Sequence, residues 1–383
     1  MITCPIPYPR ISTIQEAKSW TNIGTALIQY LLYRIRLANI PDFHGDFRDI
    51  MIVLGRSLKW TSQLHMIFTE NCPKEHGAVY CSNHIMKDDP FITGASIFLA
   101  SGQNVWVDYM MRDDFFAKWP KTRFFDPDEI LGLFKARPIS RGKVNLKQIR
   151  LFVNILKNGG SFLMYPGRTR SRSGLLMEYR DGFDDPAGPS FFINQLASIK
   201  PGLPTVPIAR TFNPVNKRST VAFGKPMTMP LDADRHTQRA FDFAVIDAIG
   251  NLIEIHAPHI IASILYLRAL HGLHTPIDIP LLEEAVRRAP QNLPERPCDP
   301  AMIQSTTHQT RATLEFFART GLIALTKNQA TPLPASILNL PPIDANFSKI
   351  NPIRTLTNQI IHLPDLIHYL ESTKDLTALR NSC

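Results

Sequence analysis

A histidine and an aspartate five positions apart are the residues of this chain best suited to chemistry. His84 directly follows Asn83 and a short apolar run over residues 77–81, and Asp89 precedes Pro90. A neutral imidazole can take a proton from a hydroxyl near pH 7, and a carboxylate on its other nitrogen fixes the tautomer and stabilises the imidazolium. We therefore predict that His84 is a general base oriented by Asp89.

The elements around this pair fit that role. The apolar run predicts a buried strand, and α/β proteins keep their sites at the carboxyl ends of such strands. Because Pro90 disfavours helical geometry at the residue before it, the segment from His84 to Asp89 is predicted to be a turn. Two plainer roles remain open. A histidine is more often structural than catalytic, and an acidic residue can stabilise the start of a helix over residues 91–100, which is the role we expect for Asp88.

Positive charge is concentrated in one window of the sequence. The net charge is +9, and ten cations lie between residues 132 and 172 without an intervening Asp or Glu: Lys135, Arg137, Arg141, Lys143, Lys147, Arg150, Lys157, Arg168, Arg170 and Arg172. Such a cluster favours an anionic partner: a phosphate ester, a coenzyme A tail, acidic lipid headgroups or nucleic acid. Lys147, Arg150 and Lys157 are expected on the solvated face of an amphipathic helix over residues 146–157.

The other seven cations fall in two predicted loops. The first, over residues 132–143, contains Pro138 and Gly142 and is predicted to be a turn-rich connection. The second follows a predicted strand over residues 161–165 and alternates arginines with small hydroxyl residues up to Gly174. Guanidinium forks match phosphate oxygens, and hydroxyl and glycine backbone groups complete an anion cradle. Arginine-serine runs can also be disordered or bind RNA, but a single short run favours phosphate binding.

In this order the segments resemble the motifs of the glycerolipid acyltransferases. Asn83, His84 and Asp89 resemble the first motif, which is Asn-His, four residues and Asp. Residues 132–137 resemble the second, residues 165–174 the third and residues 205–209 the fourth. The end of the third motif is similar to the glycerol-3-phosphate and dihydroxyacetone-phosphate branch, as is a helix over residues 358–363. Gly167 and Arg168 stand where the family usually has Glu-Gly, so a typical acidic residue is absent.

The resemblance implies an acyltransferase that acts in the first step of phospholipid synthesis. His84 would remove a proton from the sn-1 hydroxyl of glycerol 3-phosphate, which would then attack acyl-CoA or acyl-acyl-carrier protein without a covalent acyl-enzyme. The residues implied for the acceptor phosphate are Arg137, Arg141, Lys143, Arg168, Arg170 and Arg172. Those implied for the remaining substrate-binding loop are Asn83, Gly167, Thr169 and Ser171. We expect no metal ion and no cofactor besides the acyl thioester co-substrate.

Other functions remain open. Acylation of 1-acylglycerol 3-phosphate or of dihydroxyacetone phosphate would need the same groups, and a hydrolase of acylated or phosphorylated compounds would need many of them. A basic module that binds a membrane or nucleic acid would lose affinity steeply with salt, but it leaves the pair of His84 and Asp89 without a role. We therefore expect an acyl thioester, glycerol 3-phosphate and an anionic membrane surface as partners, and no nucleic acid.

Length and composition predict an α/β protein with additional helices. The chain has 383 residues and 44% hydrophobic residues, enough for an N-terminal helical segment (1–45), an α/β core with a mixed sheet flanked by helices (46–234) and a helical C-terminal region (235–383). A leader helix is expected over residues 14–40, and Pro258 should break or kink a helical pattern over residues 241–270. The five cysteines lack metal-ligand spacing, and neither a signal peptide nor a membrane-spanning run is evident. We expect a cytoplasmic protein, peripheral on the inner membrane surface.

Overall fold

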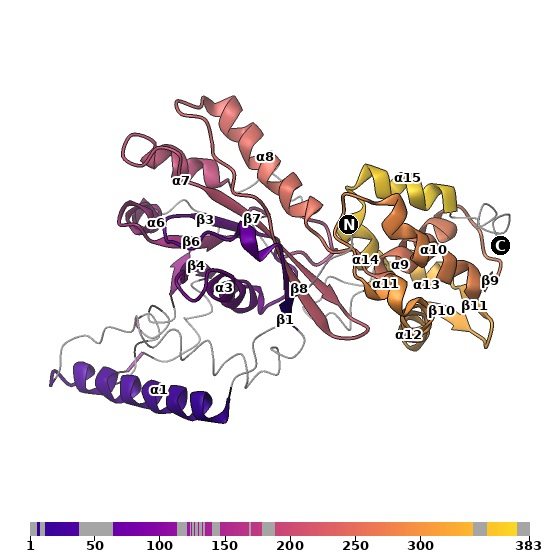
Figure 1. The fold of residues 1–383 in the computed structure, drawn as a ribbon, viewed down its shortest axis with the longest axis horizontal. Coiled ribbons are helices and arrows are strands. Elements are labelled where there is room, and N and C mark those ends of the chain that lie inside the picture. The colour runs from indigo at the N-terminus through magenta and orange to yellow at the C-terminus, as the bar shows by residue number, and fades with distance from the viewer. Residues whose placement is uncertain are drawn as a thin grey trace.

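The computed structural model describes residues 6–7, 12–37, 64–112, 121–122, 124, 126, 129, 132, 135–139, 146–167, 170–177, 188–339 and 351–373. Its elements form two groups, a sheet with flanking helices and a mainly helical C-terminal group (Figure 1). The predicted α/β class, with a central mixed sheet between helices, is confirmed.

Within the described residues, the main sheet has eight strands in the order β1-β2-β8-β7-β3-β6-β4-β5. Their bounds are β1 Ile6–Pro7, β2 Leu64–Ile67, β3 Val79–Ser82, β4 Val107–Arg112, β5 Ala136–Ile139, β6 Ser161–Met164, β7 Thr205–Asn213 and β8 Arg218–Phe223. The five strands from β7 to β5 run parallel, and β7 and β8 form an antiparallel pair. Parallel neighbours end at the same edge of a sheet, so the loops after β3 and β6 emerge side by side.

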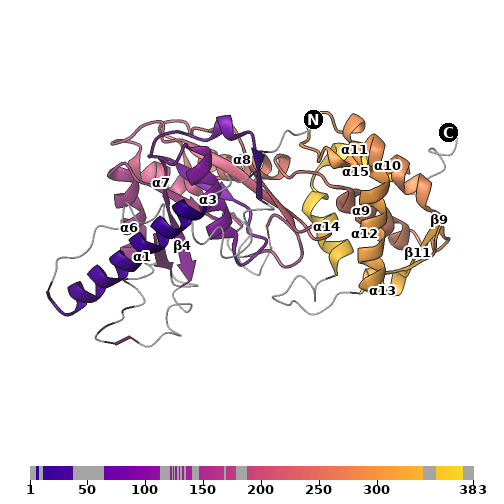
Figure 2. The same cartoon turned by 60° about the horizontal axis from the view of Figure 1, so that its bottom comes forward.

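Helices cover both faces of the sheet, which explains why its central strands are apolar without alternation. Tyr80 packs with residues of α3 (Asp89–Ala100) on one face. Cys81 belongs to the apolar cluster on the other face, which includes side chains of α6 (Leu146–Lys157), α7 (Pro189–Leu196) and α8 (Arg235–Asn251). In Figure 1, α3 lies below the strands and α7 with α8 above them, and in Figure 2 the side that carries α3 is turned towards the viewer. β3 is therefore held rigidly at the centre of the molecule's α/β part.

The C-terminal group is packed around α9 (Ala257–Leu270), whose residues are mostly buried. The other helices are α10 (Ile279–Asn292), α11 (Ala301–Gln304), α12 (Thr306–Arg319), α13 (Pro334–Leu338), α14 (Pro352–Ile360) and α15 (Pro364–Thr373). A small sheet of β10 (Ile323–Leu325), β11 (Gln329–Pro332) and β9 (Ile277–Asp278) adds strands that the sequence analysis did not anticipate. The pattern over residues 241–270 is divided between α8 and α9, because Pro258 lies in the first turn of α9, where proline is tolerated.

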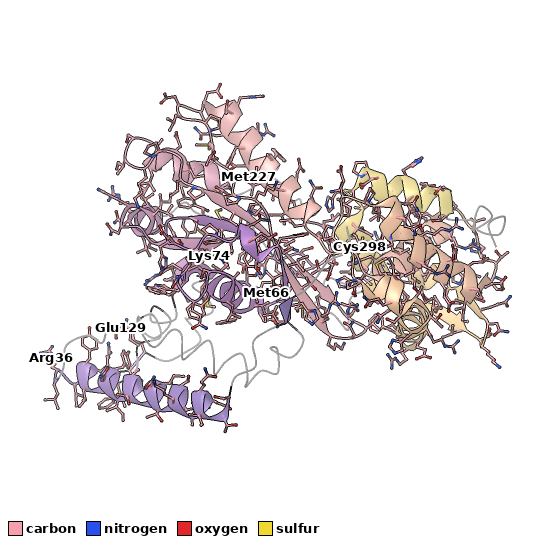
Figure 3. All side chains as sticks on the ribbon, in the orientation of Figure 1. Arg36, Met66, Lys74, Glu129, Met227 and Cys298 are labelled. Atoms are coloured by element: carbon pink, nitrogen blue, oxygen red, sulfur yellow. The ribbon has the colours of Figure 1, made fainter. Side chains whose placement is uncertain are left out.

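The leader helix is α1 (Thr13–Arg34), which begins at a capping box formed by Ser12 and Gln15. One side of α1 is held by Tyr30, which is buried and donates a hydrogen bond to Glu129. Figure 3 labels Glu129 beside α1. Elsewhere along α1, large apolar side chains are exposed: Ile14, Trp20, Leu27, Ile28 and Leu31. None of the helices that the structure describes has the length and apolar character of a membrane span.

Candidate functional site

The predicted turn after β3 is present and is fixed to the neighbouring strand by Asn83. The side-chain amide of Asn83 donates to the carbonyl oxygen of Arg210 at 2.8 Å, and its oxygen accepts from the Arg210 amide at 2.7 Å. Asn83 is 7% exposed. It therefore holds the start of the loop against β7 and has little surface left for a substrate.

His84 and Asp89 meet as the sequence predicts. His84 Nδ1 lies 2.7 Å from Asp89 Oδ2, which also accepts from the backbone amides of Ile85 at 2.6 Å and Met86 at 2.8 Å. Burial alone would raise the pKa of Asp89, but the charge of Arg210 and the hydrogen bond from His84 lower it below its usual value. An ionised carboxylate can only accept. The proton of His84 is therefore on Nδ1, which leaves Nε2 as a base.

Strands on both sides of β3 support the imidazole. Tyr165, directly after β6, stacks on His84 with ring centroids 4.5 Å apart and planes at 26°. On the other side, β7 pairs Ser82 with Ile208, so Arg210 is level with His84. The His84 side chain is 22% exposed while that of Asp89 is fully buried. The histidine is thus reachable at a fixed orientation.

Arg210 is a site residue that the sequence analysis missed. Its guanidinium is 2% exposed and donates to Asp89 at 2.6 Å and to Asp88 at 2.8 Å. Asp88 lies at the start of α3 as expected, but its side chain pairs with Arg210 and makes no capping hydrogen bond. The available signal was a single cation inside the apolar strand β7, because a buried charge requires a partner.

The arginine loop, defined here by its described residues 170–177, is attached to the turn that carries His84. The Ser171 amide donates to the His84 carbonyl oxygen at 2.6 Å, and the Ser171 hydroxyl accepts from the Gly174 amide at 2.9 Å. Gly167 lies before this loop, where a Cβ atom would be 2.6 Å from the carbonyl oxygen of Leu176. Gly167 therefore permits the close return of the chain.

Two arginines of this loop contribute positive charge near His84. Burial and the charge of Arg172 lower the pKa of Arg170, whereas Asp89 raises it, which places Arg170 within electrostatic range of both. No described residue forms an ion pair with Arg170. Two neighbouring cations repel each other, so an anion between them would be stabilised.

The other predicted cations are placed differently or lie outside the described residues. The expected turn around Arg137 is wrong, because Arg137 lies in β5, where edge position tolerates the following proline. It donates to Asp108 of β4 at 2.6 Å. The strand register places Arg137 level with Cys81 of β3, but the two residues are three strand spacings apart across the sheet, or about 14 Å. Outside the described residues lie Arg141, Lys143, Arg168 and Thr169.

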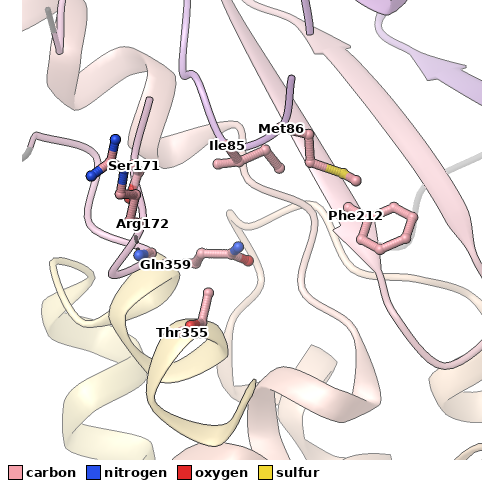
Figure 4. Close-up of a pocket in the computed structure, with 8 residues that line it drawn as sticks. Ile85, Met86, Ser171, Arg172, Phe212, Thr355 and Gln359 are labelled. Atoms are coloured by element: carbon pink, nitrogen blue, oxygen red, sulfur yellow. Dashed lines mark hydrogen bonds between the residues drawn. The ribbon is translucent and has the colours of Figure 1, made fainter. Parts of the chain in front are cut away.

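A pocket opens beside the histidine turn, between the arginine loop, β7 and α14 (Figure 4). Its lining residues are Ile85, Met86, Ser171, Arg172, Gly174, Phe212, Thr355 and Gln359. Apolar side chains from the histidine turn and β7 form one side, and polar groups of the arginine loop and α14 form the other. A base, nearby cations and a partly apolar pocket together suit the activation of a hydroxyl on an anionic amphiphile.

The chain is similar to known proteins over part of its length. Residues 63–209 match the family described as Acyltransferase, a range that includes His84, Asp89 and the arginine loop. The crystal structure of the 1-acyl-sn-glycerophosphate (LPA) acyltransferase PlsC from Thermotoga maritima is similar over 61% of this chain and 92% of that chain, with 14% identity and a TM-score of 0.38. No curated protein matches the chain. Residues 63–209 are therefore similar to the Acyltransferase family.

Proposed function

We propose that this protein moves a fatty acyl group from acyl-CoA or acyl-acyl-carrier protein to the sn-1 hydroxyl of glycerol 3-phosphate. The observation that carries the proposal is the direct link between base and cations. The backbone of His84 accepts a hydrogen bond from Ser171 in the arginine loop, so a phosphate held by that loop would lie close to Nε2 of the histidine.

The reaction would proceed by general base catalysis. Nε2 of His84 accepts the proton of the acceptor hydroxyl as its oxygen bonds to the thioester carbonyl carbon. The buried carboxylate of Asp89 stabilises the resulting imidazolium. When the tetrahedral intermediate collapses, the carbon–sulfur bond breaks and the leaving thiolate takes the proton from His84. The products are an ester and a free thiol, and the enzyme returns to its initial state.

The acceptor phosphate would bind to Arg170 and Arg172. Their guanidinium groups match phosphate oxygens and supply charge close to the histidine. Arg141, Lys143 and Arg168 remain candidates for the same role, whereas Arg137 already pairs with Asp108. Holding the phosphate would fix the hydroxyl against the base, and positioning of this kind contributes a large part of the rate.

The other acceptors share the hydroxyl and phosphate that this geometry requires. A direct test incubates the purified protein with labelled acyl thioester and, separately, glycerol 3-phosphate, dihydroxyacetone phosphate, 1-acylglycerol 3-phosphate or no acceptor. Faster lipid formation with glycerol 3-phosphate than with the others supports the proposal. If another phosphate compound reacts faster, that compound is the acceptor in place of glycerol 3-phosphate. Release of free fatty acid alone, or no reaction, contradicts the proposed acyl transfer.

A further inference from the structure

Helix α14 lies directly against the arginine loop, although the contacting residues Ser173 and Asn358 are 185 positions apart in sequence. The Asn358 side-chain amide donates to the carbonyl oxygen of Ser173 at 2.9 Å. One residue further, Gly174 has φ of +97°, and a Cβ atom there would collide with the backbone carbonyl of Thr355. The loop can approach α14 this closely only because it has a glycine at that position. α14 also lies outside the matched acyltransferase range of residues 63–209.

Gln359, the next residue of α14, is held in a defined orientation by a buried histidine. Its Oε1 lies 2.9 Å from Nε2 of His259, whose Nδ1 accepts from the backbone amide of His256 at 3.1 Å. Burial, with a smaller contribution from His256, lowers the pKa of His259 to about 3, so the ring is neutral at pH 7. With Nδ1 accepting, the single ring proton is on Nε2 and is donated to Gln359.

This hydrogen bond determines which amide group of Gln359 remains for a ligand. Rotating the amide would place its NH₂ group against the N–H of His259, so the oxygen must face the histidine and the nitrogen must face away. The residue is 4% exposed and lines the pocket together with Arg172 and Ser171 (Figure 4). Its amide nitrogen makes no hydrogen bond to any described residue. The nitrogen faces the pocket, where a ligand or a water molecule can accept its hydrogen bond.

We infer that Gln359 donates a hydrogen bond to a phosphate oxygen of the acceptor, so that α14 completes the acceptor site from outside the matched range. The identity of the ligand rests on the proposed function. The cations of the arginine loop attract an anion, and the neutral donor of Gln359 selects an oxygen at a fixed position. Asn358 acts on the same site indirectly by holding the loop through Ser173.

A purely structural role for Gln359 makes a different prediction from this one. Packing against His259 requires only an oxygen, which Gln359→Glu retains. The ligand role requires the NH₂ group, which Gln359→Glu replaces with a second oxygen that repels phosphate. Gln359→Met has a similar length and removes both groups. Gln304→Glu, at an exposed position of α11 that does not line the pocket, makes the same chemical change and serves as the matched control.

The experiment measures equilibrium binding of glycerol 3-phosphate and of inorganic phosphate by isothermal titration calorimetry, alongside steady-state kinetics. We expect Gln359→Glu to weaken phosphate binding and raise the acceptor KM by about 10-fold or more, as for loss of a hydrogen bond to a charged group. The thioester KM should stay unchanged. Gln359→Met should weaken binding to a similar extent, and Gln304→Glu should not.

Two results would overturn the inference, and they can be told apart. If the native protein binds the phosphate compounds and both Gln359 variants bind them equally well, the assignment of Gln359 is wrong while the proposed function stands. If the native protein binds none of them, the assignment and the proposed acceptor both fail. Loss of thermal stability in Gln359→Glu with unchanged phosphate affinity would show the structural role instead.

Discussion

At the scale of residues, the site depends on how a buried carboxylate is kept ionised. Asp89 is fully buried, but it accepts two backbone hydrogen bonds and pairs with Arg210. Removing one partner from a buried ion pair leaves an uncompensated charge, which costs far more than the pair itself contributes. Arg210 is therefore as necessary to the histidine turn as the predicted pair of His84 and Asp89.

We predict that Arg210→Met lowers the free energy of unfolding by about 3–5 kcal/mol. The reason is that Asp89 would then be buried without its cation. Denaturant unfolding measures the change, and Asp88→Asn is the control, because Asp88 is more exposed and should cost less than about 1 kcal/mol. Equal effects of the two substitutions would show that Arg210 does not compensate Asp89.

His259 makes the stability of the fold depend on pH. Its folded pKa is about 3, below the unfolded value of about 6.5, so the unfolded chain binds more protons between these values. Its contribution to stability is complete above pH 6.5 and is lost as pH falls towards 3. We predict that His259→Gln reduces the slope of unfolding free energy against pH in this window by about one proton. The exposed control His308→Gln should leave the slope unchanged, and an unchanged slope in His259→Gln would contradict the prediction.

At the scale of elements, local sequence patterns were sufficient to predict the strand and the turn at the centre of the site. The apolar run before Asn83 and the helical spacing over residues 146–157 correctly predicted β3 and α6. The turn after Asn83 is also present, but Asp89 is the first residue of α3 and not the end of the turn, because proline is tolerated in the first turn of a helix. Contacts between distant segments could not be predicted in this way. The position of Arg210 depends on the pairing of β7 with β3, and the approach of α14 to the arginine loop depends on tertiary packing.

The contact between α14 and the arginine loop can be tested with two glycines. Both Gly174 and Gly202 have positive φ, but a Cβ atom at Gly174 meets the backbone of Thr355, whereas at Gly202 it meets open space. Both alanine substitutions carry the cost of left-handed geometry, about 1–2 kcal/mol. We predict that Gly174→Ala lowers the free energy of unfolding by more than this shared cost and raises the acceptor KM. Gly202→Ala should show only the shared cost and leave the acceptor KM unchanged. Equal behaviour of the two variants would exclude a tight contact.

At the scale of the whole molecule, the sheet and the C-terminal helices are joined by a buried charge cluster. Arg218 of β8 pairs with Glu254 at 2.7 Å and with Asp299 at 3.0 Å, and His256 lies between the two carboxylates. Cys298, beside this cluster, lies where the two groups of elements meet (Figure 3). These contacts hold the segment that leads into α9 and therefore support His259 and Gln359.

The exposed apolar side chains of α1 give a prediction about membranes. Amphipathic helices bury such side chains at a lipid surface, and nearby cations favour anionic lipids. We predict that the protein pellets with anionic vesicles at low salt and that Leu27→Gln with Leu31→Gln weakens this binding. Leu270→Gln, which removes a similarly exposed leucine from α9, is the control. Failure to pellet, or equal weakening by the control, would contradict a membrane role for α1.

The central claim is that His84 is the base for acyl transfer to a phosphorylated acceptor, and the most direct test is the initial rate of lipid formation by His84→Ala. Loss of a general base predicts a fall of about 10²- to 10⁴-fold, with an unchanged melting temperature and native phosphate binding. The exposed control His308→Ala should keep the native rate. A folded His84→Ala variant that forms product at the native rate would contradict the account.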